Sequence, residues 1–227
     1  MLERAEADVS VSLDQIRGTV KVAAFQTAAL TFLPRMTLEL QELHPELSIE
    51  FHQGEPEVTL PALNSGEYDV VITEAYPGFP APSLPGIAYQ PLFEDALWLA
   101  VNAELASILD PTTGLIRQLA GTGWAVEALD SVPRTWVINE CRKNGFEPRI
   151  VCSTEDLAVQ RRFVEAGLAV AVLPGLALEE GSPNIRRFPT GLGIQNREIL
   201  AAYRKASEKR PALGAVLSAF HRESAKY

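Results

Sequence analysis

The chain has 227 residues, of which 47% are hydrophobic and 22% charged, with 20 Lys and Arg against 29 Asp and Glu. This composition is typical of a globular protein and excludes collagen-like, low-complexity and largely disordered chains. The formal net charge of -9 argues against direct binding of nucleic acid by this chain, because contacts to phosphate depend on clustered Lys and Arg. Two cysteines are too few for a disulfide framework.

The N-terminal residues carry no targeting signal. Residues 1–20 lack the apolar stretch of about 7–15 residues that a signal peptide needs. Elsewhere no run approaches the ~18 consecutive apolar residues of a membrane span. We therefore expect a cytoplasmic chain with no membrane partner.

The first part of the chain shows alternating helix and strand signals. Residues 2–17 have the spacing of an amphipathic helix that ends at Gly18. From there the pattern predicts, in order, a strand over 20–25, a helix from Thr27 as N-cap to 44–45, a strand over 47–51, a helix over 58–64 ended by Gly66 and a strand over 70–73. Pro34 makes the early part of the first of these helices irregular.

A second cycle follows the Pro- and Gly-rich residues 77–86. It predicts strands over 96–101, 122–126, 150–152, 168–173 and 198–203, and helices over 114–119, 134–144, 155–166 and 208–224. Strands that alternate with helices indicate βαβ units and parallel sheets with both faces covered. Two such rounds predict an α/β fold of two similar lobes, in which a ligand binds at the carboxyl ends of strands or between the lobes.

Motifs of catalysis are absent. There is no Gly-x-Gly-x-x-Gly after a strand, no Walker loop and no Gly-x-Ser-x-Gly elbow. The three histidines, His44, His52 and His221, share no local metal-ligand spacing with a cysteine or carboxylate. The sequence therefore predicts a protein that is not an enzyme and that holds no metal and no cofactor.

Polar residues at strand ends are the candidates for a binding site. Gln26 and Thr27 follow the first strand and open a helix, and Ser153 and Thr154 follow a later strand in the same way. A helix N-terminus offers free N–H groups and a partial positive charge, which suit a carboxylate. The alternative is that Thr27 and Ser153 are only helix caps, and Ser153 with Asp156 does resemble a capping box.

Two acids also follow strands. Glu74 and Glu127 would place negative charge near the same site, where they would select an ammonium or hydroxyl group on a ligand. The alternative is that both are solvated loop acids.

Four segments carry a resemblance to a known family. They are, in order, Gly18-Thr-Val-Lys-Val22 with Thr27, Leu33-Pro34 and His44-Pro45-Glu-Leu; Leu63-Asn-Ser-Gly66-Glu-Tyr-Asp69-Val-Val-Ile72; Pro91-Leu-Phe-Glu-Asp95 before an apolar strand; and Glu165-Ala-Gly167-Leu-Ala-Val-Ala-Val-Leu-Pro174. Together they resemble the effector-binding domain of LysR-type transcription regulators over about residues 2–224.

The resemblance implies two Rossmann-like lobes of the type II periplasmic-binding-protein kind, joined by two crossover segments. Residues 1–17 would be the remnant of a linker helix, residues 18–95 plus 198–227 regulatory lobe I, and residues 96–197 regulatory lobe II. It also implies a small organic effector, such as a carboxylate, in the interlobe cleft. Its site residues carry over to Gln26, Thr27, Glu74, Glu127, Ser153 and Thr154.

The family implies partners as well. The effector would alter the arrangement of a homodimer or tetramer and thereby transcription, with DNA bound only through a winged helix-turn-helix head that is absent from this chain. The chain begins inside what resembles the linker helix, so it is either an excised fragment or a natural truncation.

Two alternatives to this function stay open. One is a stand-alone solute-binding protein of the same fold, which would need an export signal. The other is a redox-responsive regulator, because one branch of the family senses peroxide through two cysteines in the second lobe. Cys141 lies near the position of one of that pair, but no cysteine lies near Ser131, where the other belongs, so the switch would have to use Cys152.

Overall fold

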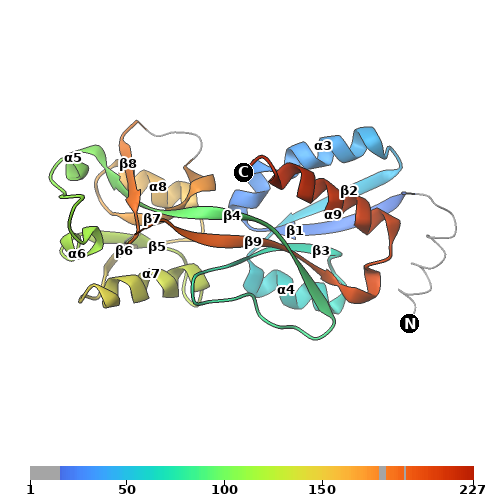
Figure 1. Ribbon diagram of the computed structural model, residues 1–227, viewed down its shortest axis with the longest axis horizontal. Coiled ribbons are helices and arrows are strands. Elements are labelled where there is room, and N and C mark those ends of the chain that lie inside the picture. The colour runs from blue at the N-terminus through green and yellow to red at the C-terminus, as the bar shows by residue number, and fades with distance from the viewer. Residues whose placement is uncertain (1–15, 179–182, 192) are drawn as a thin grey trace. The chain divides into compact units, whose positions relative to one another are not determined.

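The computed structural model describes residues 16–178, 183–191 and 193–227 (Figure 1). The helix expected over 2–17 lies outside the described residues except for its last two. The chain forms two compact units: unit 1 comprises the residues up to Ala75 with Ala81–Glu94 and Glu198–Tyr227, and unit 2 comprises Tyr76–Pro80 and Asp95–Arg197.

Two long strands pass from one unit into the other. They are β4 (Ile87–Asn102) and β9 (Gln195–Arg204). The strand order is β2-β1-β3-β9-β4-β7, with β8 also paired to β4, and β5 and β6 form a separate two-stranded sheet. The sequence predicted only the second half of β4, because Pro91 and the acidic pair at its centre interrupt the apolar pattern.

Unit 1 is built around a parallel core of three strands. Its other elements are β1 (Gly18–Ala24), α2 (Gln26–Thr31), α3 (Leu33–Leu43), β2 (Leu47–Gln53), α4 (Pro56–Ser65), β3 (Val70–Ala75), the short 3-10 turn η2 (Lys205–Ser207) and α9 (Pro211–Ser224). β1 is parallel to both β2 and β3, and β3 is antiparallel to β9.

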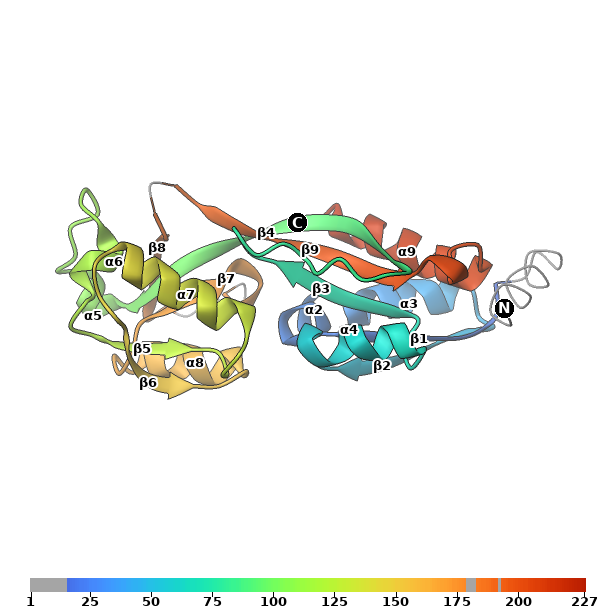
Figure 2. The ribbon, with the colours of Figure 1, turned by 90° about the horizontal axis from the view of Figure 1, so that it is seen from below.

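Helices cover both faces of this sheet. Val22 and Ala24 pack with residues of α3 and α9, whereas Ala23, between them, packs with Leu60 and Leu63 of α4. This is the alternation of a strand whose successive side chains point to opposite faces. In Figures 1 and 2, α3 and α9 lie together on one side of the strands and α4 on the other, so the predicted cover on both faces is confirmed. The expected parallel sheet is only partly right, because β9 runs antiparallel to β3.

The predicted long helix after β1 is two helices. α2 ends at Thr31 and α3 begins at Leu33, with Pro34 in its first turn. Pro has no N–H to continue the hydrogen-bond ladder of α2, which explains the break. Thr27 is not the N-cap: Phe25 occupies that position without a side-chain hydrogen bond, and Thr27 is the buried second residue of α2.

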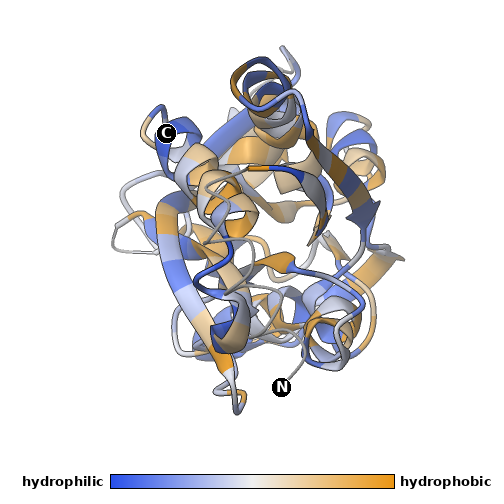
Figure 3. Ribbon diagram, turned by 90° about the vertical axis from the view of Figure 1, so that its right-hand side faces the viewer, coloured by the Kyte–Doolittle hydropathy of each residue, from blue (hydrophilic) through white to orange (hydrophobic). Residues whose placement is uncertain are grey.

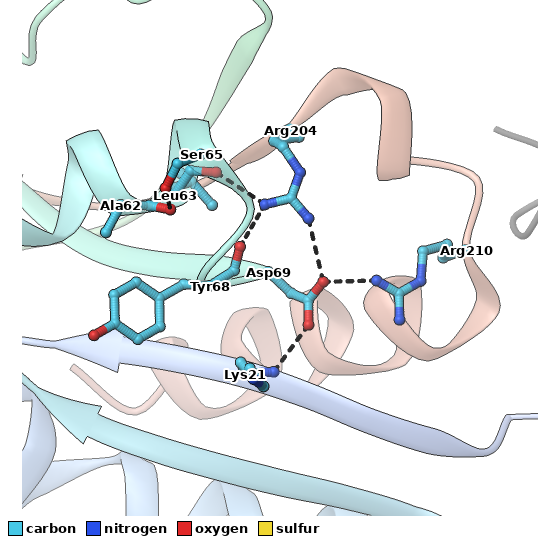
Figure 4. Close-up of polar contacts among 8 residues, drawn as sticks. All are labelled: Lys21, Ala62, Leu63, Ser65, Tyr68, Asp69, Arg204 and Arg210. Carbon is cyan, nitrogen blue, oxygen red and sulfur yellow. Dashed lines mark hydrogen bonds and ion pairs between the residues drawn. The ribbon is translucent and has the colours of Figure 1, made fainter. Parts of the chain in front are cut away.

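The turn between α4 and β3 is held by the largely buried carboxylate of Asp69, whose side chain is 13% exposed. Asp69 accepts a hydrogen bond from the Lys21 N–H of β1 (3.0 Å) and binds Arg210 Nη1 (2.6 Å) and Arg204 Nη2 (3.4 Å), as Figure 4 shows. Arg204 Nη1 also donates to the carbonyls of Leu63 and Tyr68. Asp69 therefore ties the end of the second family-like segment to β1 and to the C-terminal part of the chain.

Unit 2 repeats the strand–helix alternation with shorter strands. Its elements besides β4 and β9 are α5 (Ala103–Ala106), α6 (Leu115–Gln118), β5 (Gly123–Val126), α7 (Val132–Lys143), β6 (Arg149–Ser153), α8 (Leu157–Glu165), β7 (Ala171–Pro174), the 3-10 turn η1 (Gly175–Ala177) and β8 (Ile185–Pro189). β5 is parallel to β6, whereas β7 and β8 are antiparallel to β4.

The core of unit 2 also has two sides. Trp136 and Cys141 of α7 pack with Trp124 of β5, and Leu157 and Val164 of α8 pack in a separate cluster with alternate strand residues. Apolar residues recur along the strands and helices of both units (Figure 3). Within the described residues, no helix has the length and apolar character needed to span a bilayer.

Candidate functional site

In unit 1 the three predicted site residues lie at one edge of the sheet. β1 and β3 are parallel, with Ala24 opposite Ile72, so their carboxyl ends meet at the same edge. Gln26 and Thr27 open α2 directly after β1, and Glu74 is the next-to-last residue of β3. The structure thus brings together the residues that the sequence placed at these two strand ends.

Thr73 adds a buried hydroxyl at the same edge. Its side chain is 1% exposed, and its Oγ1 has no hydrogen-bond partner among the described residues. A buried hydroxyl without a partner is costly unless another molecule satisfies it. Its position directly before Glu74, at the end of an apolar strand, was visible in the sequence.

In unit 2 the other three predicted residues share the corresponding edge. Val126, the last residue of β5, lies opposite Ser153, the last residue of β6, and the Thr154 N–H donates to the Val126 carbonyl (3.1 Å). Glu127 follows directly after β5. Glu127, Ser153 and Thr154 are therefore neighbours at the carboxyl edge of this parallel pair.

Arg134, which sequence reasoning missed, lies among these residues. Its Nη1 donates to Ser153 Oγ (2.9 Å) and to the Glu127 carbonyl (2.9 Å), and Ser153 Oγ also donates to that carbonyl (3.3 Å). The guanidinium forms no ion pair with any described carboxylate. Cations are disfavoured in the first turn of a helix, and Arg134 lies in the first turn of α7. This unfavourable placement was the feature of the sequence that could have marked Arg134 as a functional residue.

Ser153 is neither the N-cap of α8 nor a member of a capping box. Asp156 is the N-cap of α8, with its carboxylate accepting from the Ala158 N–H (2.9 Å), and Thr154 Oγ1 accepts from the Asp156 N–H (3.1 Å). The expected capping box of Ser153 and Asp156 is therefore wrong. The Ser153 hydroxyl instead holds Arg134.

A small cavity in unit 2 adjoins this edge. Its walls include Tyr76, Glu127, Trp136 and Gln160. Trp136 is 1% exposed, and its Nε1 has no acceptor within the part of the chain that the structure describes. Buried indole N–H groups normally have a partner. A residue in the cavity wall therefore carries a buried N–H group without a described acceptor, close to the edge that holds Arg134.

The two cysteines lie on opposite sides of the unit 2 sheet, Cys141 with the α7 cluster and Cys152 with the α8 cluster. Both are free and buried. Burial, with the negative charges of Glu140 and Glu147, raises the pKa of the Cys141 thiol to about 12. The thiolate is the reactive form, so this environment makes Cys141 a slow redox group. In the described residues, no group of three His, Cys, Asp or Glu could hold a metal ion.

Two α/β units joined by two crossing strands, with polar residues at the carboxyl edges of their sheets, define a binding domain of the type II periplasmic-binding-protein kind. Residues 13–225 match the family model described as LysR substrate binding domain, and the chain belongs to this family. This is the family of effector-binding domains found in LysR-type transcription regulators. The expected family, fold class and general function are confirmed.

Known proteins that are similar to this chain include a transcriptional regulator, a regulatory domain and an effector-binding domain. The chain is 24% identical over 198 residues to the transcriptional dual regulator GltC of Bacillus subtilis, covering 87% of this chain and 63% of GltC. A variant of the OxyR2 regulatory domain of Vibrio vulnificus is similar in structure, with a TM-score of 0.77 at 16% identity over 92% of this chain and 96% of that one. The effector-binding domain of QuiR, in complex with shikimate, has a TM-score of 0.75 at 19% identity over 93% and 99%. The chain thus spans about six-tenths of the length of GltC.

Proposed function

We propose that this domain binds a small organic anion through the polar residues at the carboxyl edges of its two units. The residues are Gln26, Thr27, Glu74, Glu127, Ser153 and Thr154, as expected from the sequence, with Arg134 added. The observation that carries the proposal is the guanidinium of Arg134, held on the Ser153 hydroxyl without a carboxylate partner among the described residues.

The chemistry of this arrangement favours a carboxylate. Nη1 of Arg134 is used by Ser153 and the Glu127 carbonyl, whereas its Nε and Nη2 donate to no described residue. A guanidinium fork binds a carboxylate with two parallel, charge-assisted hydrogen bonds. Shikimate, named with QuiR, is a hydroxylated carboxylate, which supports this class of ligand for a protein of the same fold.

The regulatory consequence follows from linkage. A ligand shifts a protein between two arrangements only if it binds them unequally. In this proposal the effector biases the arrangement of a homodimer or tetramer in the cytoplasm, and DNA is bound by a head domain outside this chain. The domain itself acts by binding and not by catalysis.

The test is a thermal-shift screen of the chain against small carboxylates, hydroxy acids and aromatic acids. A ligand at 100 times its dissociation constant stabilises the folded state by about 2.7 kcal/mol, which such a screen detects. For each hit, calorimetry on Arg134→Lys and Arg134→Gln separates charge from geometry. Losing a charge-assisted hydrogen bond weakens binding about 10- to 100-fold, so both variants should bind more weakly, with Lys the less affected.

The matched control is Arg117→Gln, at an exposed arginine of α6 whose side chain forms no hydrogen bond or ion pair with a described residue. Binding that is unchanged in Arg134→Gln, or equally reduced in Arg117→Gln, would remove the assignment of Arg134. Thr27→Ala and Ser153→Ala test the remaining contacts from each unit in the same assay.

A further inference from the structure

Unit 2 contains a second hollow at the opposite end of its parallel strands. Gly123 and Arg149, the first residues of β5 and β6, line this hollow, whereas Val126 and Ser153, their last residues, lie at the edge described above. Its volume is about 640 Å³. Small-molecule sites have volumes of roughly 300–1,000 Å³, so the hollow is large enough for a metabolite. At ~3.3 Å per residue, one strand length separates the two places by roughly 10 Å.

Two glycines build the walls of this hollow. Gly167, with a φ of 71°, ends the turn after α8, and a Cβ there would lie 2.7 Å from Asn102 Nδ2. A Cβ at Gly123 would lie 2.8 Å from the Leu168 carbonyl oxygen. Only glycine lets these segments approach so closely. At these two glycines the wall of the hollow is therefore closely packed.

Two opposite charges line the hollow without neutralising each other. Arg149 and Glu104 both belong to its lining and both are exposed. Neither side chain forms an ion pair or hydrogen bond with any residue that the structure describes, so they are not paired with each other. A ligand with one negative and one positive group would pair with both.

The same walls leave large apolar side chains in water. Ile108 is 77% exposed and Leu168 61% exposed, and Leu105 lies beside them in the lining. Covering such surface is favourable in proportion to the apolar area removed from water. The lining therefore combines a cation, an anion and an apolar wall.

We propose that this hollow is a second small-molecule site, which takes an α-amino acid with an apolar side chain. The carboxylate binds the Arg149 guanidinium, the ammonium binds the Glu104 carboxylate, and the side chain packs on Ile108 and Leu168. The Asn102 Nδ2 group supplies a further donor at the wall. This site uses none of the residues of the proposed effector site and does not depend on it.

The test is calorimetry on the whole chain with three probes of matched shape: L-leucine, 4-methylpentanoate, which lacks the ammonium, and 3-methylbutylamine, which lacks the carboxylate. L-Leucine is expected to bind with a dissociation constant of about 1 mM or lower. Each truncated probe loses one charged contact, so each should bind at least 10-fold more weakly.

Variants locate the binding. Arg149→Gln and Glu104→Gln should each weaken L-leucine at least 10-fold, because each removes one charged partner. Arg117→Gln and Arg134→Gln should leave it unchanged, since neither residue lines the hollow. Both glutamine substitutions are at exposed positions, so the fold should be retained, and circular dichroism checks this.

Three results would overturn the proposal: no heat with L-leucine up to about 10 mM, equal binding of the three probes, or binding that Arg134→Gln abolishes and Arg149→Gln does not. A fourth concerns a different occupant. If L-leucine gives no heat and Ile108→Ser or Leu168→Ser changes the sedimentation of the chain, the hollow is an interface between copies and not a ligand site.

Discussion

Asp95 and Arg197 form a buried ion pair at the place where both crossing strands enter unit 2. Asp95 Oδ2 accepts from Arg197 Nη2 (2.7 Å) and Nε (3.0 Å), and the two side chains are 5% and 2% exposed. Asp95 is the first residue of unit 2 on β4, and Arg197 is the last on β9. The ion pair therefore connects β4 and β9 at the unit boundary.

Removing one partner of this pair should be strongly destabilising. Arg197→Met leaves the Asp95 carboxylate buried without its cation, which costs about 3–5 kcal/mol. Asp95→Asn leaves the Arg197 guanidinium buried without its anion. Urea unfolding of the two single variants and of the double variant forms a double-mutant cycle, in which the double variant should lose less than the sum of the singles. Additive losses would show that the pair contributes no coupling.

Gly175 is expected to be required for the second bond of Asp95. Asp95 Oδ1 accepts from the Leu176 N–H (3.2 Å), and a Cβ at Gly175 would lie 2.8 Å from that oxygen. Gly175→Ala should displace the carboxylate and lower the free energy of unfolding by about 1–3 kcal/mol. Gly121→Ala is the matched control, because a Cβ there meets nothing within 4 Å. Equal stability of the two variants in urea would contradict this account.

Asp69 should matter for the stability of unit 1 in a similar way. Asp69→Asn removes the negative charge that faces Arg204 and Arg210 and keeps the size of the side chain. Because these groups are largely buried, we expect a loss of about 2–4 kcal/mol in urea unfolding. Glu50→Gln, at an exposed acid of β2, should change stability by less than about 0.5 kcal/mol. A loss at Asp69 no larger than at Glu50 would show that the three contacts of its carboxylate add nothing net.

Local patterns predicted most of the fold, since buried strands and helix ends leave signals in the nearby sequence. The alternating cores around Val22 and Ala23 are one example. β8 left no such signal: it is an edge strand of only five residues with two arginines, and its pairing with β4 depends on contacts far along the chain. Separation along the chain also limited how much of the candidate site could be predicted. Strand ends predicted its edges, but Arg134 reaches Ser153 from 19 residues away, which no local pattern shows.

The wrong capping predictions have the same physical origin. A serine or threonine before a helix can donate or accept in several directions, and local sequence shows only one of them. At Ser153 the competing partners are Arg134 and the Glu127 carbonyl, and Asp156 is left to cap the helix. The side chains that failed as caps are thus the ones whose polar atoms lie at the proposed site.

Cys141 should react slowly with thiol reagents and make stability depend on alkaline pH. Its pKa is raised to about 12, chiefly by burial. A cysteine in the unfolded chain ionises near pH 8.5, so the folded state binds the extra proton between these values. The contribution of Cys141 to stability is complete below about pH 8.5 and is lost as the pH rises towards 12.

The measurement is urea unfolding of the chain and of Cys141→Ala between about pH 8 and pH 10, where the stability difference should shrink as pH rises. Labelling by an alkylating reagent at pH 8 should be slower at Cys141 than in the urea-unfolded chain, because little thiolate forms in the folded state. Cys152→Ala serves as the background in which Cys141 is the only thiol. Labelling as fast as in the unfolded chain would show that Cys141 is an accessible, reactive thiol. That result would favour the alternative of a redox-responsive regulator.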